Sequence, residues 1–308
     1  MSVLYALEGI RTPFGDLFFS AVTHLGEETV FMVAAIFVFW CVSKKEGYYL
    51  LTVGFLGTIF NQFLKLLFRI PRPWVKDPDF TIVESARAEA TGYSFPSGHT
   101  QSAVGTFGGI ARFVKRSWVR LVCVVLLLLV AFSRMYLGVH TPLDVGVSFV
   151  LGTLLVLAVY PLMDWAYRKP GRMAGLFGVM ALLCAAELIF VYGYPFPADI
   201  DAANLASGRE NAWKLLGSVV GVALSWGIDV KWLRFETRAR WWAQIAKLAI
   251  GLALVIAVRT LLKAPLLALF GDAGIAGCVR YFLVVLTACV LWPATFGWWS
   301  RLGERQRK

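Results

Sequence analysis

Long apolar segments alternate with short polar ones along most of the chain. The apolar segments lie at about 27–43, 48–68, 100–114, 118–139, 143–166, 174–193, 213–229, 242–264 and 279–299. Most are close to the roughly 20 residues that an α-helix needs to cross about 30 Å of hydrocarbon. The segments at 100–114 and 213–229 are shorter and rich in small residues. The pattern predicts an all-α fold, a polytopic transmembrane helix bundle of about nine spans.

The composition supports this prediction and excludes a soluble protein. Hydrophobic residues make up 58% of the chain and charged residues only 16%, which lies outside the usual balance of a soluble domain. The first residues, MSVLYALEGIRTPFGDLFF, lack the basic start and clean apolar core of a signal peptide. Because Thr12 and Pro13 form a plausible helix start, we expect residues 1–26 to be an interfacial N-terminal segment.

The basic net charge is explained by membrane topology and predicts no nucleic-acid partner. The net charge is +11, but if the apolar segments span alternately, most Lys and Arg residues outside the motifs fall on one side. That side includes basic clusters at 44–45, 112–120 and 168–172. By the positive-inside rule this side is cytoplasmic. We therefore expect a multi-pass protein of the plasma (inner) membrane whose partner is the lipid bilayer.

The longest polar interruption, residues 71–100, cannot lie in lipid, since its irregular backbone would leave amides unpaired there. It is predicted to be an extracytoplasmic loop. The helix that leads into it carries polar side chains within roughly 80° of one another around its axis. These residues are Asn61, Lys65, Arg69 and Arg72. They form one polar stripe, which Pro71 and Pro73 are expected to end.

The loop ends in FPSGHTQS, residues 95–102, which is typical of a helix start. Pro96 and Ser97 fit a first turn, and Gly98 allows a ligand to approach the backbone closely. Free N–H groups at such a start favour an anion. The basic stripe supplies positive charge, and arginine adds a planar fork that matches phosphate oxygens. Together the two segments predict a phosphate-binding cradle.

A third polar segment, SRMYLGVHTPLD at 133–144, follows an apolar run long enough to cross a bilayer. Charged groups at the edge of hydrocarbon are costly, so Arg134, His140 and Asp144 need a reason to be there. An imidazole can act as nucleophile or proton carrier, and a nearby carboxylate can fix its tautomer. His99, in the preceding segment, is a second imidazole.

Each of these residues also has an ordinary structural interpretation. Asp144 resembles the acid of a capping box after Thr141, and Ser97 resembles a helix cap. Lys65 and Arg69 could be cations that snorkel at a helix end. The joint spacing favours the functional interpretation for the set, but Arg69 matches no fixed position and is only a possible accessory residue.

Glu187, within ALLCAAELIFVYG, is a second possible accessory residue. An ionisable group inside a predicted span suggests a function. It could equally pair with Arg259 or take up a proton.

The three segments together resemble the signature of the type 2 phosphatidic acid phosphatase (PAP2) superfamily. The signature runs through Lys65, six residues, Arg72-Pro73; then Pro96-Ser97-Gly98-His99; then Ser133-Arg134, five residues, His140, three residues and Asp144. The resemblance covers about residues 27–166. It implies a PAP2-like catalytic core of the six-helix type at 27–171, with additional C-terminal transmembrane helices at 172–308. Soluble vanadium haloperoxidases share the signature, but this apolar chain does not fit that branch.

The resemblance implies specific roles for the signature residues. His140 is expected to attack phosphorus and form a phosphohistidine, while Asp144 orients it. His99 is expected to protonate the leaving oxygen and then to activate water. The remaining residues are expected to bind the phosphate oxygens: Lys65, Arg72, Ser97, Gly98 and Arg134. The sequence contains no carboxylate cluster recognisable as a metal site, so we expect neither a metal nor another cofactor.

The expected activity is removal of the terminal phosphate from a membrane lipid phosphate or diphosphate. Phosphatidic acid, phosphatidylglycerol phosphate, a sphingoid phosphate and undecaprenyl diphosphate all remain candidate substrates. One alternative is a lipid phosphotransferase, because an alcohol can resolve the same intermediate. A less favoured alternative is an anion transporter that uses the basic pocket without chemistry.

Overall fold

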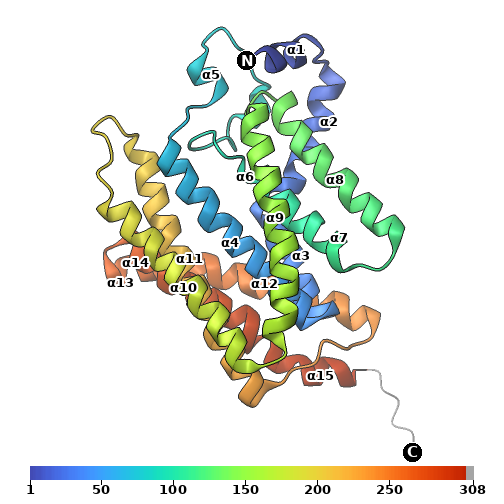
Figure 1. The fold of residues 1–308 in the computed structure, drawn as a ribbon. Coiled ribbons are helices and arrows are strands. Elements are labelled where there is room, and N and C mark those ends of the chain that lie inside the picture. The colour runs from blue at the N-terminus through green and yellow to red at the C-terminus, as the bar shows by residue number, and fades with distance from the viewer. Residues whose placement is uncertain (303–308) are drawn as a thin grey trace, which may run out of the picture. The chain divides into compact units, whose positions relative to one another are not determined.

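The computed structural model describes residues 1–302, and within them every regular element is helical. The α-helices are α1 (Ser2–Gly9), α2 (Pro13–Thr23), α3 (Glu28–Phe37), α4 (Lys44–Phe68), α5 (Pro73–Lys76), α6 (Gly98–Ala103), α7 (Gly109–Phe113), α8 (Ser117–Tyr136), α9 (Pro142–Tyr167), α10 (Pro170–Gly193), α11 (Ala202–Ile228), α12 (Trp241–Leu261), α13 (Lys263–Phe270), α14 (Ala273–Leu286) and α15 (Phe296–Arg301). Single π-helical turns extend α3, α11 and α14, and another joins α6 to α7. The predicted all-α class is confirmed (Figure 1).

The protein is a multi-pass membrane protein. In the described part of the chain, 7 helical stretches are long and apolar enough to cross a membrane, or up to 8 if a pair bent by 50° counts as one span. That pair joins Pro13–Gly26 to Glu28–Val42. The predicted segment at 100–114 falls in the helical stretch from α6 to α7, which ends at Phe113 before it reaches a spanning length.

The chain divides into two compact units. Unit 1 comprises Met1–Ala34 and Leu50–Pro161, and unit 2 comprises Ala35–Tyr49 and Leu162–Lys308. Helices α3, α4 and α9 each contribute to both units. The predicted boundaries at 26 and 171 stay a prediction, and the end of the 172–308 segment lies outside the described residues.

In unit 1 the N-terminal helices pack against the long loop. Leu4 of α1 is fully buried in a cluster with Phe80 and Ile82 of the loop. Arg11 donates to the Thr81 carbonyl and, through Nε, to the Tyr136 carbonyl at the end of α8. These contacts hold the loop at the end of the unit where α4 and α8 finish and α6 and α9 begin (Figure 1).

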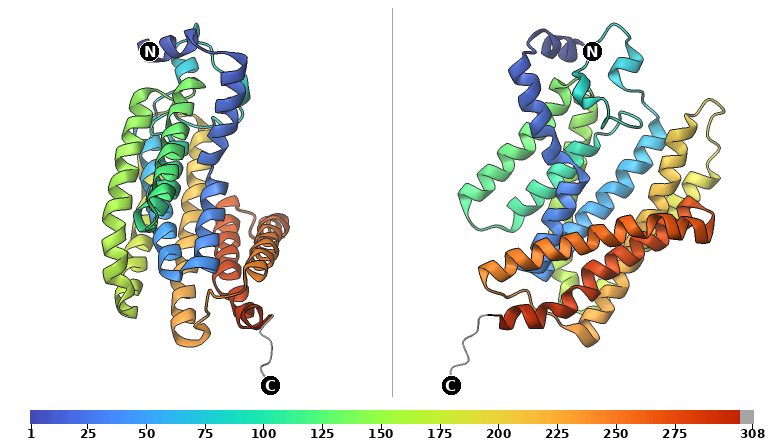
Figure 2. Two further views of the ribbon diagram at one scale, coloured as in Figure 1. Left: turned by 90° about the vertical axis from the view of Figure 1, so that its right-hand side faces the viewer. Right: turned by 180° about the vertical axis from the view of Figure 1, so that it is seen from behind.

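Unit 2 is built around α11, which packs against α10 and α14 (Figure 2). The backbones of α11 and α14 approach very closely, since a Cβ placed on Gly217 would lie 2.1 Å from the Cys278 carbonyl oxygen. Small residues permit such contacts between membrane helices. A buried ion pair adds to this packing, with Lys44 Nζ 2.7 Å from Asp229 Oδ2.

Candidate active site

The three polar segments singled out in the sequence meet at one end of unit 1. Lys65 lies near the end of α4, Ser97 begins α6, Arg134 lies in the last turn of α8, and Asp144 lies in the first turn of α9. His140 lies in the turn between α8 and α9. Four helix ends therefore bring residues from distant parts of the sequence to the same place (Figure 1).

Arg72 connects the long loop to the turn that contains His140. Its Nε donates to the Gly92 carbonyl at 3.0 Å, its Nη2 to the Thr91 carbonyl at 2.6 Å and its Nη1 to the Val139 carbonyl at 3.0 Å. The same Nη1 lies 2.9 Å from His140 Nε2. The guanidinium is thus held beside the imidazole by carbonyls on both sides of it.

This contact determines the tautomer of His140. A guanidinium can only donate, so His140 Nε2 must accept, and the ring proton must lie on Nδ1. Nδ1 faces Ser94 Oγ at 3.5 Å and Asp144 Oδ2 at 3.6 Å. The lone pair of Nε2 therefore points away from the carboxylate and toward the cations, as a nucleophile at phosphorus requires.

Asp144 is both a helix cap and the partner of His140. Its Oδ2 accepts from the Thr141 N–H at 2.7 Å, and its own N–H donates to Thr141 Oγ1 at 3.2 Å, which is a capping box. The same Oδ2 accepts from Ser94 Oγ at 2.6 Å. The interpretation of Asp144 as a capping-box acid is correct, and the capping hydrogen bonds hold its carboxylate near the imidazole.

Arg134 is fully buried, with 0% of its surface exposed. Its Nη1 donates to Thr23 Oγ1 at 2.6 Å. Its Nε and Nη2 have no hydrogen-bond partner among residues 1–302. Leaving buried donors of a charged group unpaired is costly, so these two N–H groups are suited to an anionic ligand such as phosphate.

Ser97 and Gly98 form the start of α6. Ser97 Oγ accepts from the Thr100 N–H and hydroxyl, so it caps the helix, and its own O–H can still donate. A Cβ placed on Gly98 would meet only Asn61 Oδ1, at 4.0 Å. The glycine thus leaves room beside the backbone, where an anion can approach the helix start.

His99, the second residue of α6, faces an acidic side chain of the loop. Its Nε2 lies 3.7 Å from Glu89 Oε2, and neither atom has a hydrogen-bond partner within the described residues. The distance is too long for a direct hydrogen bond and is suited to a bridging water or substrate atom. The arrangement gives His99 an acidic neighbour that can hold or exchange a proton with it.

Burial and nearby cations keep both imidazoles neutral. Burial, followed by the charges of Arg72, Arg134 and Lys65, lowers the pKa of His140 well below 6.5. Burial and then Arg134 lower the pKa of His99 from 6.5 to about 3. His140 therefore keeps its lone pair at neutral pH. The negative charge of a bound phosphate opposes the cations and raises the pKa of His99, so that the imidazole can take up the proton that a general acid must carry.

The polar stripe on α4 ends earlier than predicted. The helix stops at Phe68, because Arg69 takes a positive φ of 51°. Arg69 Nη1 turns back to the Leu66 carbonyl, and nothing brings it to His140. Lys65 Nζ donates to the Tyr93 carbonyl of the loop at 2.6 Å. Arg72 reaches the site as the residue before α5 instead of from the face of α4.

Glu187, the other possible accessory residue, lies in α10 of unit 2. It is only 3% exposed, and both carboxylate oxygens lack a hydrogen-bond partner in the described part of the chain. The alternative pairing with Arg259 is not formed among these residues. Arg259 instead lies over the Tyr281 ring, 5.9 Å from its centroid.

Three residues of the site were missed from the sequence: Thr23, Glu89 and Ser94. Thr23 and Ser94 are buried and bond to signature residues, and Glu89 is half-buried. Their positions in a helix end and an irregular loop carry no periodic signal. For Ser94 a weak signal existed, since it is a polar residue three positions before Ser97 in a segment that must approach the site.

The loop also assembles a small acidic group that the sequence did not reveal. The possible ligand atoms of His24, Glu27 and Glu89 lie within 4.8 Å of one another. His24 Nδ1 is 2.5 Å from Glu27 Oε1 and 3.1 Å from Glu89 Oε1. The side chain of His24 is 55% exposed. One hydrogen bond joins His24 Nδ1 to Glu27 Oε1, and Glu89 lies close to the same nitrogen.

Comparison with known families matches two parts of the chain. The PAP2 superfamily matches residues 45–168, and the family described as "PAP2 superfamily phosphatase, transmembrane extension" matches residues 213–305. The first match contains every residue of the three-part signature. The second falls within unit 2.

Individual relatives act on different lipids, as their names state. A probable sphingosine-1-phosphate phosphatase of Dictyostelium discoideum is 31% identical over 248 residues, 76% of this chain and 57% of that protein. Phosphatidylglycerophosphatase B of Bacillus subtilis is 28% identical over 165 residues, 49% of this chain and 76% of that protein. The undecaprenyl-diphosphatase BcrC of the same organism is 33% identical over 117 residues, 38% of this chain and 55% of that protein.

The chain spans about half the length of the sphingoid-phosphate relatives from Dictyostelium discoideum and Schizosaccharomyces pombe. No solved structure matches the chain.

Proposed function

Because the chain belongs to the PAP2 superfamily, we propose that it is a membrane phosphatase that removes the terminal phosphate of a lipid phosphate or diphosphate. One observation carries the proposal. The buried imidazole of His140 accepts from Arg72 through the unprotonated Nε2, and the site also contains a buried Arg134 with two unpaired nitrogens. A nucleophile among cationic donors is the arrangement that phosphoryl transfer needs.

The proposed reaction has two steps. In the first, His99 is protonated in the complex with the bound phosphate, His140 Nε2 attacks phosphorus, the bond from phosphorus to the lipid oxygen breaks, and His99 gives its proton to that oxygen. This leaves a phosphohistidine and a lipid alcohol, or a lipid monophosphate if the substrate is a diphosphate. In the second step, His99 takes a proton from water, whose oxygen attacks phosphorus and breaks the P–N bond. Phosphate leaves, and both imidazoles return to their starting protonation states.

The remaining residues stabilise charge during these steps. Asp144 accepts from Ser94 and faces Nδ1 of His140, so it stabilises the ring as positive charge develops on it. Lys65, Arg72, Arg134, Ser97 and the Gly98 amide are proposed to bind the phosphate oxygens. No proposed step uses a metal ion.

The charge distribution supports a site on the extracytoplasmic side of the plasma membrane. Basic clusters such as 112–120 and 168–172 lie at the opposite ends of α8 and α9 from the site. A lipid headgroup in the outer leaflet could then reach the four helix ends while its chain stays in hydrocarbon. Protease or biotin accessibility of a tag in the 71–96 loop of intact cells tests this orientation.

A phosphate-release panel tests the activity. Purified protein in detergent is given phosphatidic acid, phosphatidylglycerol phosphate, sphingosine 1-phosphate and undecaprenyl diphosphate in turn. We expect release from at least one lipid, inhibition by vanadate as an analogue of the transition state, and no effect of a chelator. Activity lost to the chelator and restored by a divalent cation would contradict the metal-free mechanism and direct attention to His24, Glu27 and Glu89.

The nucleophile is tested by His140→Ala. Removal of a covalent nucleophile should lower turnover by about 10³-fold or more. Gel filtration and thermal unfolding of the variant control for folding. Wild-type turnover in a folded His140→Ala protein would refute the mechanism.

A further inference from the structure

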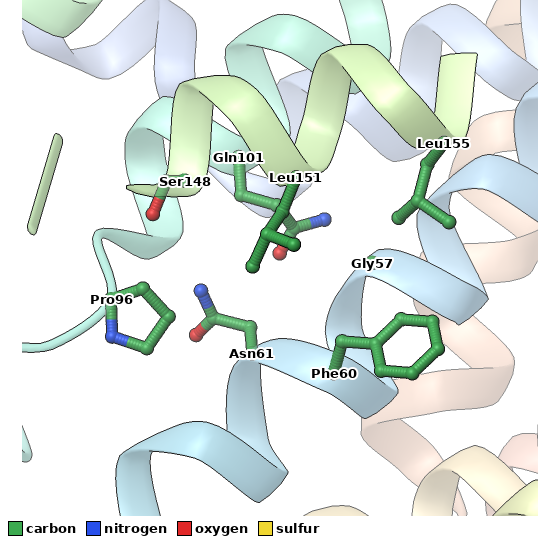
Figure 3. A pocket seen from close by; sticks show the side chains of 8 residues that line it. All are labelled: Gly57, Phe60, Asn61, Pro96, Gln101, Ser148, Leu151 and Leu155. Carbon is green, nitrogen blue, oxygen red and sulfur yellow. The ribbon is translucent and has the colours of Figure 1, made fainter. Parts of the chain in front are cut away.

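A pocket lies next to the phosphate site in unit 1, lined by α4, α6 and α9 and by Pro96 of the loop. Its empty volume is about 220 Å³, which includes space open to the exterior. Figure 3 shows Pro96 and Ser148 at one end and Phe60 and Leu155 at the other. Pro96 directly precedes the phosphate-binding segment, whereas Phe60 is exposed on α4. The pocket therefore leads from the phosphate site to an apolar surface.

Three uncharged polar side chains line the pocket, and each lies one helical turn from a residue of the phosphate site. Asn61 precedes Lys65 by four residues on α4. Gln101 follows Ser97 by four residues in α6, and its N–H donates to the Ser97 carbonyl at 3.1 Å.

On α9, Ser148 follows Asp144 by four residues. The chain runs toward the site in α4 and away from it in α6 and α9. All three polar groups are therefore displaced in the same direction, roughly 6 Å along the helices from the phosphate site.

These polar groups are buried, and their environment does not account for all of them. Ser148 is only 1% exposed, and its hydroxyl has no partner in residues 1–302. A serine in a membrane helix normally bonds to a carbonyl of its own helix. Ser225 of α11 does so, donating to the Gly221 carbonyl at 2.7 Å. Ser148 does not, although its helix offers the same kind of acceptor.

The two amides also point into the pocket. Figure 3 shows the side chains of Asn61 and Gln101 directed toward the space between α4, α6 and α9. A Cβ placed on Gly57 would overlap Gln101 Nε2, so Gly57 makes room for that amide against α4. Polar contacts between membrane helices can serve packing alone, but packing does not explain a buried hydroxyl that is left unpaired.

We propose that this pocket binds the polar linker of the lipid substrate, the part between the phosphate ester and the hydrocarbon chain, and that it prefers a linker with free hydroxyl or amine groups. The inference rests on the proposed function and specifies its substrate. Amide and hydroxyl side chains can both donate and accept, so they can pair with groups that do the same. Along the pocket, the phosphate site is followed by the three polar side chains and then by the apolar end. A lipid phosphate has the same order of groups, from phosphate through polar linker to hydrocarbon chain.

The size of the pocket favours a slender linker. Much of the 220 Å³ is open to the exterior, and the enclosed part has room for about one water molecule. It can take one small polar group, such as a hydroxyl or an amine, while the carbons that carry this group lie along the open side. Two ester-linked chains that branch next to the phosphate need more room. The preferred class is therefore a single-chain lipid phosphate with a free hydroxyl or amine near the ester.

The test compares two single-chain lipids in wild type and variants. We measure kcat/KM for sphingosine 1-phosphate and for octadecyl phosphate, which lacks the hydroxyl and the amine, in the same mixed micelles. We expect wild type to favour sphingosine 1-phosphate by about 10-fold or more, since unpaired polar groups in a site penalise a substrate that cannot bond to them. Ser148→Ala should lower this ratio by about 2- to 10-fold, the effect of one neutral hydrogen bond. Asn61→Leu and Gln101→Met should lower it similarly.

Ser225→Ala provides the matched control, because it removes a buried hydroxyl that its own helix already satisfies. It should leave the ratio unchanged. A wild-type ratio near one, or equal losses for both lipids in Ser148→Ala, would overturn the linker site while leaving the phosphatase intact. Absence of phosphate release from every lipid tested would instead refute the proposed function, and the linker site with it.

Discussion

Two fully buried cationic side chains, one in each unit, are satisfied differently. In unit 2, Lys247 is fully buried, and its ammonium donates to the Trp40 carbonyl at 2.9 Å and the Thr237 carbonyl at 3.1 Å. In unit 1, Arg134 is equally buried, yet two of its three nitrogens have no partner within the described residues. Burial of charge therefore does not identify a binding site. Donors that the protein leaves unpaired are the better indicator.

The ionic contacts of the units differ in the same way. Lys44 and Asp229 of unit 2 form a direct pair at 2.7 Å, and Asp229 also accepts from the Phe235 N–H. In unit 1, Asp144 bonds to Ser94 and Thr141, and His140 Nδ1 stays 3.6 Å away. In the first arrangement, both charged groups are paired with each other. The second holds an imidazole in place and leaves its other nitrogen for chemistry.

Among the variants that compare the two units, the largest effect is expected for Arg134→Lys. The substitution keeps the charge but removes the fork of N–H groups, so it should lower kcat/KM by about 10²- to 10³-fold, as for loss of a transition-state donor. The rate is measured on the best lipid of the phosphate-release panel. Arg172→Lys in unit 2, where the side chain donates to the Trp165 carbonyl and lies over the Trp165 ring, is the control and should stay within about twofold. An effect of Arg134→Lys that also stays within about twofold would show that Arg134 does not bind the phosphate.

Asp229→Asn should act on stability instead of catalysis. Loss of one partner leaves the Lys44 ammonium without its counter-charge, which should lower the free energy of unfolding by about 2–4 kcal/mol. Thermal unfolding in detergent measures the change, and turnover per folded molecule should stay near wild type. Unchanged thermal stability, or a tenfold fall in turnover, would contradict the expectation that this ion pair of unit 2 contributes to stability and not to catalysis.

The two site histidines should resist protonation. Since the pKa of His140 lies well below 6.5 and that of His99 is about 3, both should remain neutral as the pH falls through 6.5. The unfolded chain binds these protons first, so their contribution to stability is present above pH 6.5 and is lost as the pH falls below it. The chain has 3 histidines, so NMR of ¹⁵N-histidine in His24→Ala observes only these two. Protonation of either near pH 6.5 would contradict the expectation.

The smallest effect is expected for Glu187→Gln. Unlike Lys44 and Asp229, Glu187 of unit 2 is buried with no partner for its carboxylate among the described residues. Within residues 1–302 its carboxylate has no hydrogen bond to the residues proposed to bind phosphate, so phosphate release should stay within about twofold of wild type. A loss above tenfold, with normal folding, would show that the accessory role considered from the sequence was correct.

The sequence predicted those parts of the site whose spacing follows from helix geometry. His140 and Asp144 are four residues apart at a helix start, and Lys65 lies near a helix end, so their positions could be inferred before the structure. The helical class and most spans followed from apolar length. The prediction for Arg72 was only partly correct, because the positive φ of Arg69 ends α4 early and moves Arg72 off the helix face.

The loop residues could not be predicted in this way. Ser94 and Glu89 reach the site through irregular backbone, which has no period to read. Thr23 meets Arg134 across 111 positions of sequence. Such contacts depend on how the N-terminal helices and the loop pack, and that packing is a tertiary property. The sequence therefore revealed the reacting groups better than the groups that hold them in place.

The bonds of Arg72 have a consequence for how the protein could diversify. The Arg72 guanidinium donates hydrogen bonds to the carbonyls of Thr91, Gly92 and Val139. The part of the loop near residues 91–92 is therefore held in place without help from residues 75–79. The outer stretch at 75–79 is mostly exposed and lies outside these anchors. Insertions, deletions or substitutions there should be tolerated without shifting the reacting groups. Evolution can thus remodel the tip of the loop while the residues around Arg72 keep their positions.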